Sequence, residues 1–187
     1  MRVKLALAVI AIAASSTPDS AAAFCGSPDG VAFGDQPAVR AANNARVFWT
    51  TETKIHKALA VRLDNANDRF VVLRSTEPDV SVEGCLRSGA YLRLATAGFL
   101  DYLIADTNIN STVVKIGREF GPPKYKGDGI FFVQKLGGSK GDLIRYGDTF
   151  RIRGTTGNAW LCQSCGNQSL IGLTQADSKA TGWRFVK

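Results

Sequence analysis

"IRYGDTFRIRGTTGNAWLCQS", residues 144–164, carries apolar side chains at alternate positions on both sides of a turn rich in Gly, Thr and Asn. Alternation bounded by turn residues predicts two short β-strands. The stretch "RSGAYLRLATAGFLDYLIADT", residues 87–107, has much the same pattern, and its Gly89 precedes Gly147 by 58 residues. Similarity at such a spacing indicates an internal repeat.

A third copy of the pattern begins at Gly34 in "FGD", which precedes Gly89 by 55 residues. Large apolar residues recur in each copy at matching distances from the glycine. They are Val39, Leu94 and Ile152 five residues on, Phe48, Leu103 and Leu161 fourteen residues on, and Phe70, Phe132 and Trp183 near the end of each unit. The sequence therefore predicts three repeats, at about 30–76, 84–136 and 142–187, with these nine residues in the core.

Each repeat contains about four short apolar runs separated by Gly, Asn, Asp and Pro, which are strand and turn signals. In "AVRAANNARVF", residues 38–48, the Asn-Asn pair and the repeat register favour a hairpin over a helical turn. Three four-stranded units could form a propeller or a β-trefoil, but propellers usually have at least four blades. We therefore predict an all-β protein, a β-trefoil of three four-stranded repeats with pseudo-threefold symmetry.

The N-terminal residues 1–23 have the features of a secretory signal peptide. Arg2 and Lys4 precede the apolar run "LALAVIAIAA", and Ala21 and Ala23 fit the small-residue cleavage rule. The apolar run is shorter than the roughly 20 residues of a membrane-spanning helix. We expect a single trefoil domain at 24–187 that is secreted, or periplasmic in a bacterium, with no membrane span.

Four cysteines, Cys25, Cys85, Cys162 and Cys165, remain after this leader. An even number in an exported chain predicts disulfides, and three pairings are possible. Cys162 and Cys165 flank a turn rather than opening a helix, which favours a bridge across the turn over a redox motif. Cys25 would then pair with Cys85. A zinc site is not favoured, because His56 is the only histidine.

The formal net charge is +7, spread along the chain without a block of Lys or Arg. This charge suits a soluble surface or attraction to anionic glycans, and we expect no nucleic-acid partner for an exported protein. His56 lies between two lysines and no GxSxG motif accompanies it, so the sequence offers no nucleophile–base pair. We predict a protein that is not an enzyme and needs no cofactor or metal.

The unit "YGDTFRIRGTTGNAWLCQS…GLTQADSKATGWRFVK" resembles the repeats of fascin-like and MIR-like β-trefoils. In those repeats a Gly-Asp precedes a strand, a "WL" or "YL" closes the next, and an aromatic residue ends the unit. Ricin-B-type lectins are more distantly similar, because their Gln-x-Trp motif is missing here. The resemblance implies the trefoil fold, and by analogy a binding function.

We expect a secreted binding module that recognises carbohydrate or glycoconjugate ligands, including anionic ones. Sugar sites combine an aromatic face with polar groups, and three aromatic residues occupy neighbouring offsets in the repeats. The predicted ligand-binding residues are Trp49, Tyr102 and Trp160, with Asp101, Asp106 and Asn158. This prediction requires the aromatic side chains to face outward.

An alternative function is binding of a protein, such as a hydrolase, receptor or filament, through the insertion at 121–129. There Lys124, Tyr125 and Lys126 place an aromatic residue between two cations. Arg40, Arg93 and Arg151 also fall near equivalent places in the three units. Their alternation with core residues predicts an outward face, which would serve solubility or repeated ligand sites.

Overall fold

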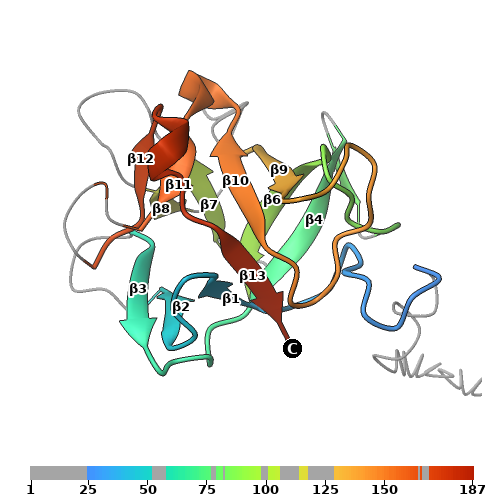
Figure 1. The fold of residues 1–187 in the computed structure, drawn as a ribbon, viewed down its shortest axis with the longest axis horizontal. Coiled ribbons are helices and arrows are strands. Elements are labelled where there is room, and N and C mark those ends of the chain that lie inside the picture. Colours follow the sequence, from blue (N-terminus) through green and yellow to red (C-terminus); the bar gives the residue numbers. More distant parts are fainter. Residues whose placement is uncertain are drawn as a thin grey trace, which may run out of the picture.

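The computed structural model describes residues 25–51, 58–76, 79–81, 83–97, 101–105, 114–117, 129–163, 165 and 169–187. These residues form thirteen strands and two short 3-10 helices (Figure 1). No helix among them is long and apolar enough to cross a bilayer. His56, Asp106, Lys124, Tyr125 and Lys126 lie outside the described residues.

The strands follow the three predicted repeats in chain order. The first unit contains β1 (Ala38–Ala41), β2 (Val47–Thr50), β3 (Ala60–Leu63) and β4 (Phe70–Thr76), followed by the additional strand β5 (Asp79–Ser81). The second contains β6 (Tyr91–Thr96), β7 (Tyr102–Ala105), β8 (Val114–Gly117) and β9 (Phe131–Lys135). The third contains β10 (Phe150–Gly154), helix η1 (Thr156–Asn158), β11 (Trp160–Cys162), β12 (Gly172–Thr174), helix η2 (Asp177–Lys179) and β13 (Trp183–Val186).

Six of these strands form a barrel, and the first and last strands of the units pair in one repeated register. Strand β1 pairs with β13, β6 with β4, and β10 with β9, all antiparallel. The equivalent partners are Val39 with Phe185, Leu94 with Val72, and Ile152 with Val133, and all six side chains are buried. Hairpins β2–β3, β7–β8 and β11–β12 complete the units. The predicted β-trefoil is thus confirmed.

Two closed rings of backbone hydrogen bonds show the pseudo-threefold symmetry directly. In the first ring the amide of Val31 donates to the carbonyl of Ile144 at 2.9 Å, Ile144 donates to Leu86 at 3.0 Å, and Leu86 donates to Val31 at 2.8 Å. The second ring joins one residue of each unit in the same way, with Leu59 donating to Val114, Val114 to Ile171 and Ile171 to Leu59, at 2.8 to 3.0 Å. Each ring ties all three units together without any side chain.

The glycines that mark the repeats have one conformation and one partner in common. Gly34, Gly89 and Gly147 have φ of 96°, 90° and 86°, a region that favours glycine. Their amides donate to the carbonyls of Val72, Val133 and Phe185 at 2.7, 2.8 and 2.9 Å, respectively. The glycine therefore recurs because each unit needs the same left-handed turn at the barrel wall.

Seven of the nine predicted core residues are buried, and two predictions are wrong by one residue. Phe48 is only half-buried, and its neighbour Trp49 is the fully buried equivalent of Leu103 and Leu161. The connection from β1 to β2 is one residue longer than its counterparts, and a shift of one residue moves a side chain to the other face of a strand. Likewise Phe131, not the half-buried Phe132, is the equivalent of Phe70 and Trp183.

Both predicted disulfides are present, Cys25–Cys85 and Cys162–Cys165. The first joins the segment before the first barrel strand to the segment that connects units one and two. Next to it, Ala32 forms a β-bridge with Cys85, and the amide of Phe33 donates to the carbonyl of Gly84 at 2.9 Å. This bridge and hydrogen bond hold one wall of a surface pocket.

Candidate functional site

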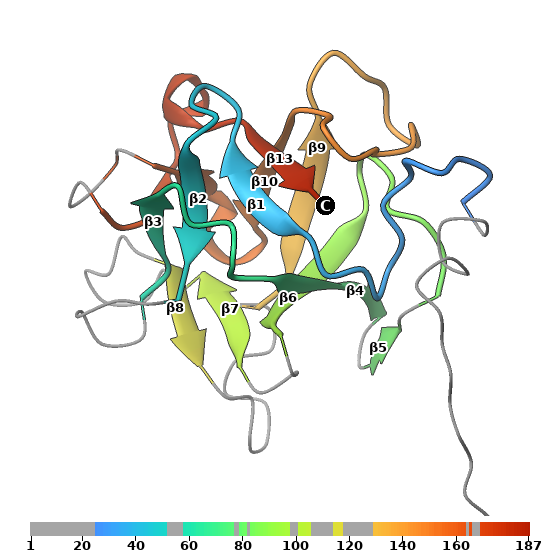
Figure 2. The ribbon, with the colours of Figure 1, turned by 90° about the horizontal axis from the view of Figure 1, so that it is seen from below.

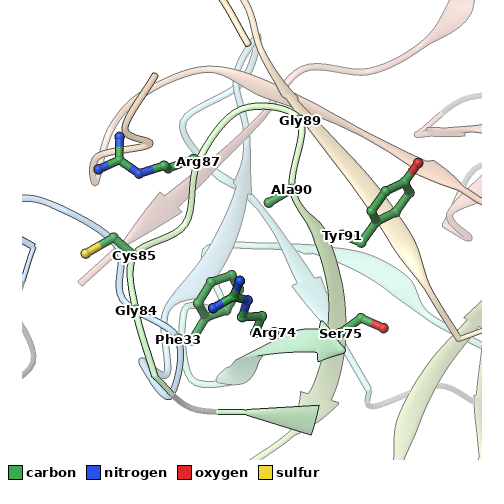
Figure 3. Close-up of a pocket in the computed structure, with 9 residues that line it drawn as sticks. All are labelled: Phe33, Arg74, Ser75, Gly84, Cys85, Arg87, Gly89, Ala90 and Tyr91. Carbon is green, nitrogen blue, oxygen red and sulfur yellow. The ribbon is translucent and has the colours of Figure 1, made fainter. Parts of the chain in front are cut away.

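A half-open pocket of about 420 Å³ lies where the end of β4 faces the segment that leads into β6. Its lining residues come from three stretches of the chain, namely Phe33, the pair Arg74 and Ser75, and the segment of Gly84, Cys85, Arg87, Gly89, Ala90 and Tyr91. Figure 3 shows Phe33 and Arg74 inside the bend that the chain makes from Gly84 to Tyr91. The volume is of the size that accommodates a small ligand.

The pocket combines a buried apolar residue with exposed polar groups. Phe33 is nearly fully buried, whereas Arg74 and Arg87 are both exposed. Arg87 is partly fixed, because its Nη1 donates to the carbonyl of Gly141 at 2.9 Å. The lining set described by the structure contains two arginines and no carboxylate. The electrostatic character of this pocket is therefore cationic, which suits a ligand with a negative group.

Tyr91 supplies an aromatic face next to these cations. Its side chain is 54 % exposed, and among the described residues Leu63 is the one other large hydrophobic residue that is exposed. Its ring contacts that of Phe132 on the neighbouring strand β9, with centroids 5.8 Å apart. In Figure 3 the Tyr91 ring points away from the bend on the side opposite to Arg87. A ligand in the pocket could thus contact guanidinium groups and extend onto a supported aromatic ring.

The predicted ligand-binding residues that the structure describes do not line this pocket. The expectation that Trp49 faces outward is wrong, because its side chain is fully buried in the core. Tyr102 is half-buried against Val71, Leu73 and Ala95, and Trp160 is only 8 % exposed. Asp101 is half-buried and Asn158 is exposed, and neither they nor the three aromatic residues line the pocket. Asp106 and the loop residues Lys124, Tyr125 and Lys126 are not among the described residues.

The register explains the error in the aromatic set. Phe48, Tyr102 and Trp160 are the true equivalents, because they precede by one residue the buried Trp49, Leu103 and Leu161. The predicted set of arginines is also only partly equivalent. Arg93 and Arg151 precede Leu94 and Ile152, whereas Arg40 follows Val39. Arg93 is moreover only 8 % exposed, so the prediction that it faces solvent is wrong.

Sequence reasoning missed Phe33, Arg74, Arg87 and Tyr91. Only Tyr91 carried a usable signal. It precedes the core residues Leu92 and Leu94 on the opposite face of the strand, and an aromatic residue at the start of a strand beside a turn is a candidate for exposure. Phe33 and Arg74 are 41 residues apart and gave no such signal. Only the closure of the barrel brings them together.

Solved structures with the same fold share little sequence with this chain. A Caenorhabditis elegans protein of unknown function matches with a TM-score of 0.64 and 12 % identity, over 85 % of this chain and 97 % of that one. The SDF2-like protein from Arabidopsis thaliana matches with a TM-score of 0.63 and 11 % identity, over 84 % and 95 %. At these identities the likeness shows the fold alone.

A third similar structure is the ligand-binding domain of botulinum neurotoxin serotype D, solved in complex with N-acetylneuraminic acid. It matches with a TM-score of 0.59 and 14 % identity, over 84 % of this chain, which spans 42 % of the toxin chain. No protein-family model matches this sequence. No curated protein matches it either.

Proposed function

We propose that this protein is a secreted, non-enzymatic module that binds a carbohydrate with an acidic group in the pocket between Arg74, Arg87 and Tyr91. The exposed Tyr91 at the edge of a cationic pocket is the observation that carries the proposal. The apolar face of a sugar ring can pack on a tyrosine ring, while its polar groups need hydrogen-bonding partners close by. Tyr91 supplies the ring at the edge of the pocket, and Arg74 and Arg87 supply the hydrogen-bond donors.

The two arginines give the proposed site its preference for ligands with an acidic group. A guanidinium group presents a planar set of N–H donors that matches the oxygens of a carboxylate or a sulfate ester. Arg74 on β4 and Arg87 in the segment before β6 both line the pocket, with Arg74 inside the bend and the Arg87 side chain extending outward from it (Figure 3). An acidic substituent in the pocket would gain from the positive charge of these arginines, whereas a neutral sugar would not.

The fold and the disulfides support the wider parts of the proposal. A toxin ligand-binding domain, of which the part similar to this chain is 42 %, has been solved with N-acetylneuraminic acid, an acidic sugar. Disulfides such as Cys25–Cys85 persist in oxidising compartments, which agrees with secretion after removal of the predicted signal peptide. Fold likeness at this identity is analogy, so the proposal depends on the geometry of the pocket.

A glycan array tests the proposal with the wild type, Tyr91→Ala and the control Leu63→Ala. Leu63 on β3 is 59 % exposed and does not line the pocket, and β3 lies on the opposite side of the ribbon from β5 (Figure 2). We expect acidic glycans to give the strongest signals, and Tyr91→Ala to weaken them about tenfold while Leu63→Ala leaves them unchanged. A silent array, or binding that survives Tyr91→Ala, would contradict the proposal.

A further inference from the structure

The outer face of the trefoil carries three equivalent rows of side chains that run across neighbouring strands. In the first row Arg62 on β3 lies opposite Phe48 on β2, Phe48 lies opposite Arg40 on β1, and Arg40 lies opposite Arg184 on β13. We call these four residues the arginine row. The equivalent rows are Gly117, Tyr102, Ala95 and Val71 in one case, and Thr174, Trp160, Arg153 and Phe132 in the other.

Arg153 and Arg40 occupy equivalent positions in two of the rows, but their environments differ. In the third row the guanidinium of Arg153 lies between two aromatic rings, 4.9 Å from the centre of Phe132 and 5.1 Å from that of Trp160. Such contacts stabilise a positive charge. In the arginine row the equivalent Arg40 has Phe48 on one side but a second cation, Arg184, on the other. Like charges directly opposite each other destabilise a sheet.

Neither Arg40 nor Arg184 is neutralised by a carboxylate among the described residues. The side chain of Arg40 makes no ion pair or hydrogen bond within the described part of the chain, and its Nε is shielded from solvent without a partner. The Nε of Arg184 donates to the hydroxyl of Thr149 at 3.0 Å, and a hydroxyl carries no charge. Within the described part of the chain no carboxylate therefore offsets the repulsion between Arg40 and Arg184.

We propose that the arginine row is a second binding site, which takes a sulfated polysaccharide chain. Neighbouring strands are about 4.8 Å apart, so Arg40 and Arg184 are separated by one strand spacing, and Arg62 lies two spacings from Arg40 across the same sheet surface. Guanidinium groups pair with sulfate oxygens through two parallel hydrogen bonds. The half-buried Phe48 adds an apolar surface between Arg62 and Arg40. A chain of repeated negative charges would turn the repulsion within the row into attraction.

This site is separate from the pocket and does not rest on the proposed function. Strands β1, β2, β3 and β13 lie together, at a distance from β5 and the end of β4, where the pocket is found (Figure 2). A polysaccharide is favoured over nucleic acid because the disulfides indicate an oxidising, extracellular compartment. A membrane is less suitable, because recognition of anionic lipid usually takes a cluster of about four to eight cations.

Binding of heparin, a sulfated polysaccharide, tests the inference. All proteins carry Tyr91→Ala and Arg74→Gln, so that any contribution of the pocket is weakened equally throughout, and Arg40→Gln and Arg184→Gln are compared with the control Arg145→Gln. Arg145 is exposed and lies outside both the row and the pocket. We expect each row variant to weaken heparin binding about tenfold and the control less than about twofold, with binding that falls as salt rises.

The stability of the row variants without heparin is a second measurement, because replacing an arginine with a purely structural role would lower it. Because Arg40→Gln relieves the repulsion from Arg184, its unfolding midpoint without heparin should equal or exceed that of the parent, while stabilisation by heparin is reduced. Absence of heparin binding in the parent, or equal binding by the row variants, would overturn the inference. A DNA duplex that binds as tightly as heparin at the same salt would overturn the assignment to polysaccharide.

Discussion

The indole rings of Trp49 and Trp183 pack edge to face in the core, with their centroids 5.1 Å apart and their planes at 74°. The first belongs to β2 and the second to β13, so this contact joins the first repeat to the last. Phe70 also packs edge to face on Trp49, at 5.6 Å. Trp49 therefore links elements from both ends of the fold.

This contact predicts very different costs for two adjacent substitutions. Trp49→Ala should lower the free energy of unfolding by about 3–5 kcal/mol, because it removes a fully buried ring and leaves a cavity. Phe48→Ala should cost about 1 kcal/mol, because that side chain is half-buried on the outer face. Urea unfolding followed by circular dichroism measures both. Equal costs would show that the assignment of Trp49 to the inner face of β2 and Phe48 to its outer face is wrong.

The left-handed turn at the start of each unit predicts a strain cost that does not depend on packing. Gly147 has a φ of 86°, and an added Cβ would meet no heavy atom within 4 Å. Gly147→Ala should therefore destabilise by about 1–2 kcal/mol through backbone strain alone. Gly129→Ala is the control, since an added Cβ there would make only ordinary contacts at 3.5 Å and φ is not left-handed. A control variant as unstable as Gly147→Ala would refute this explanation.

The two disulfides should contribute unequally to stability. Cys25–Cys85 closes a separation of 60 residues, and Cys162–Cys165 a separation of three. In the chain-entropy model the two bridges raise the free energy of unfolding by roughly 4 and roughly 2 kcal/mol, respectively. The double variant Cys25→Ser, Cys85→Ser should accordingly unfold at a much lower urea concentration than Cys162→Ser, Cys165→Ser. The reverse order would mean that the long loop is already ordered in the unfolded chain.

Asp148 should make stability depend on pH on the acid side. Partial burial acts to raise the pKa of Asp148, but hydrogen bonds from Lys135 and from the Arg145 amide outweigh it, and the pKa lies below the ordinary 3.8. The Lys135 Nζ is 2.7 Å from the carboxylate. Because this pKa is lowered in the folded protein, the ionised Asp148 adds stability at pH values above the ordinary pKa. This stability is lost as the pH falls through the folded pKa.

The variant Asp148→Asn isolates this contribution. At neutral pH it should be less stable than the wild type by about 1 kcal/mol, since the pair is partly exposed to solvent. The difference should shrink when unfolding is repeated at pH values below the ordinary pKa. A difference that stays constant with pH would mean that the side chain acts through its shape and not through its charge.

The fold was predictable because the repeat places the same kind of residue at the same structural position three times. Val39, Leu94 and Ile152 occupy equivalent core positions, and the recurring glycine marks a backbone conformation that other residues avoid. Counting from the glycine failed at Phe48 and Trp49, because one added residue in the β1–β2 connection reverses the two faces of the strand.

The candidate site was not predictable to the same degree. Phe33, Arg74 and Tyr91 belong to segments that have no common motif, and they meet only because the barrel closes and the Cys25–Cys85 bridge holds one wall. The prediction placed ligand-binding aromatic residues on the hairpins, where Trp49 proved to be core. Core positions follow from a local periodic pattern, whereas a pocket depends on contacts between distant segments.

The charge of the pocket leads to a prediction about specificity. Arg74→Gln should weaken binding of an acidic glycan about tenfold and leave a neutral glycan of the same skeleton unaffected, because it removes one charge-assisted hydrogen bond. Lys179→Gln, an equal change of charge at an exposed position in η2, is the control. Fluorescence titration of matched acidic and neutral glycans measures the difference. An equal loss of affinity for both glycans would mean that Arg74 does not recognise the acidic group.

Backbone amide NMR during titration with the acidic glycan that binds most strongly on the array tests the central claim most directly. The proposed function predicts that the largest shift changes cluster at Phe33, at Arg74 and Ser75, and from Gly84 to Tyr91. Saturating changes centred instead on the hairpins around Tyr102 and Trp160, with the pocket amides unmoved, would contradict it.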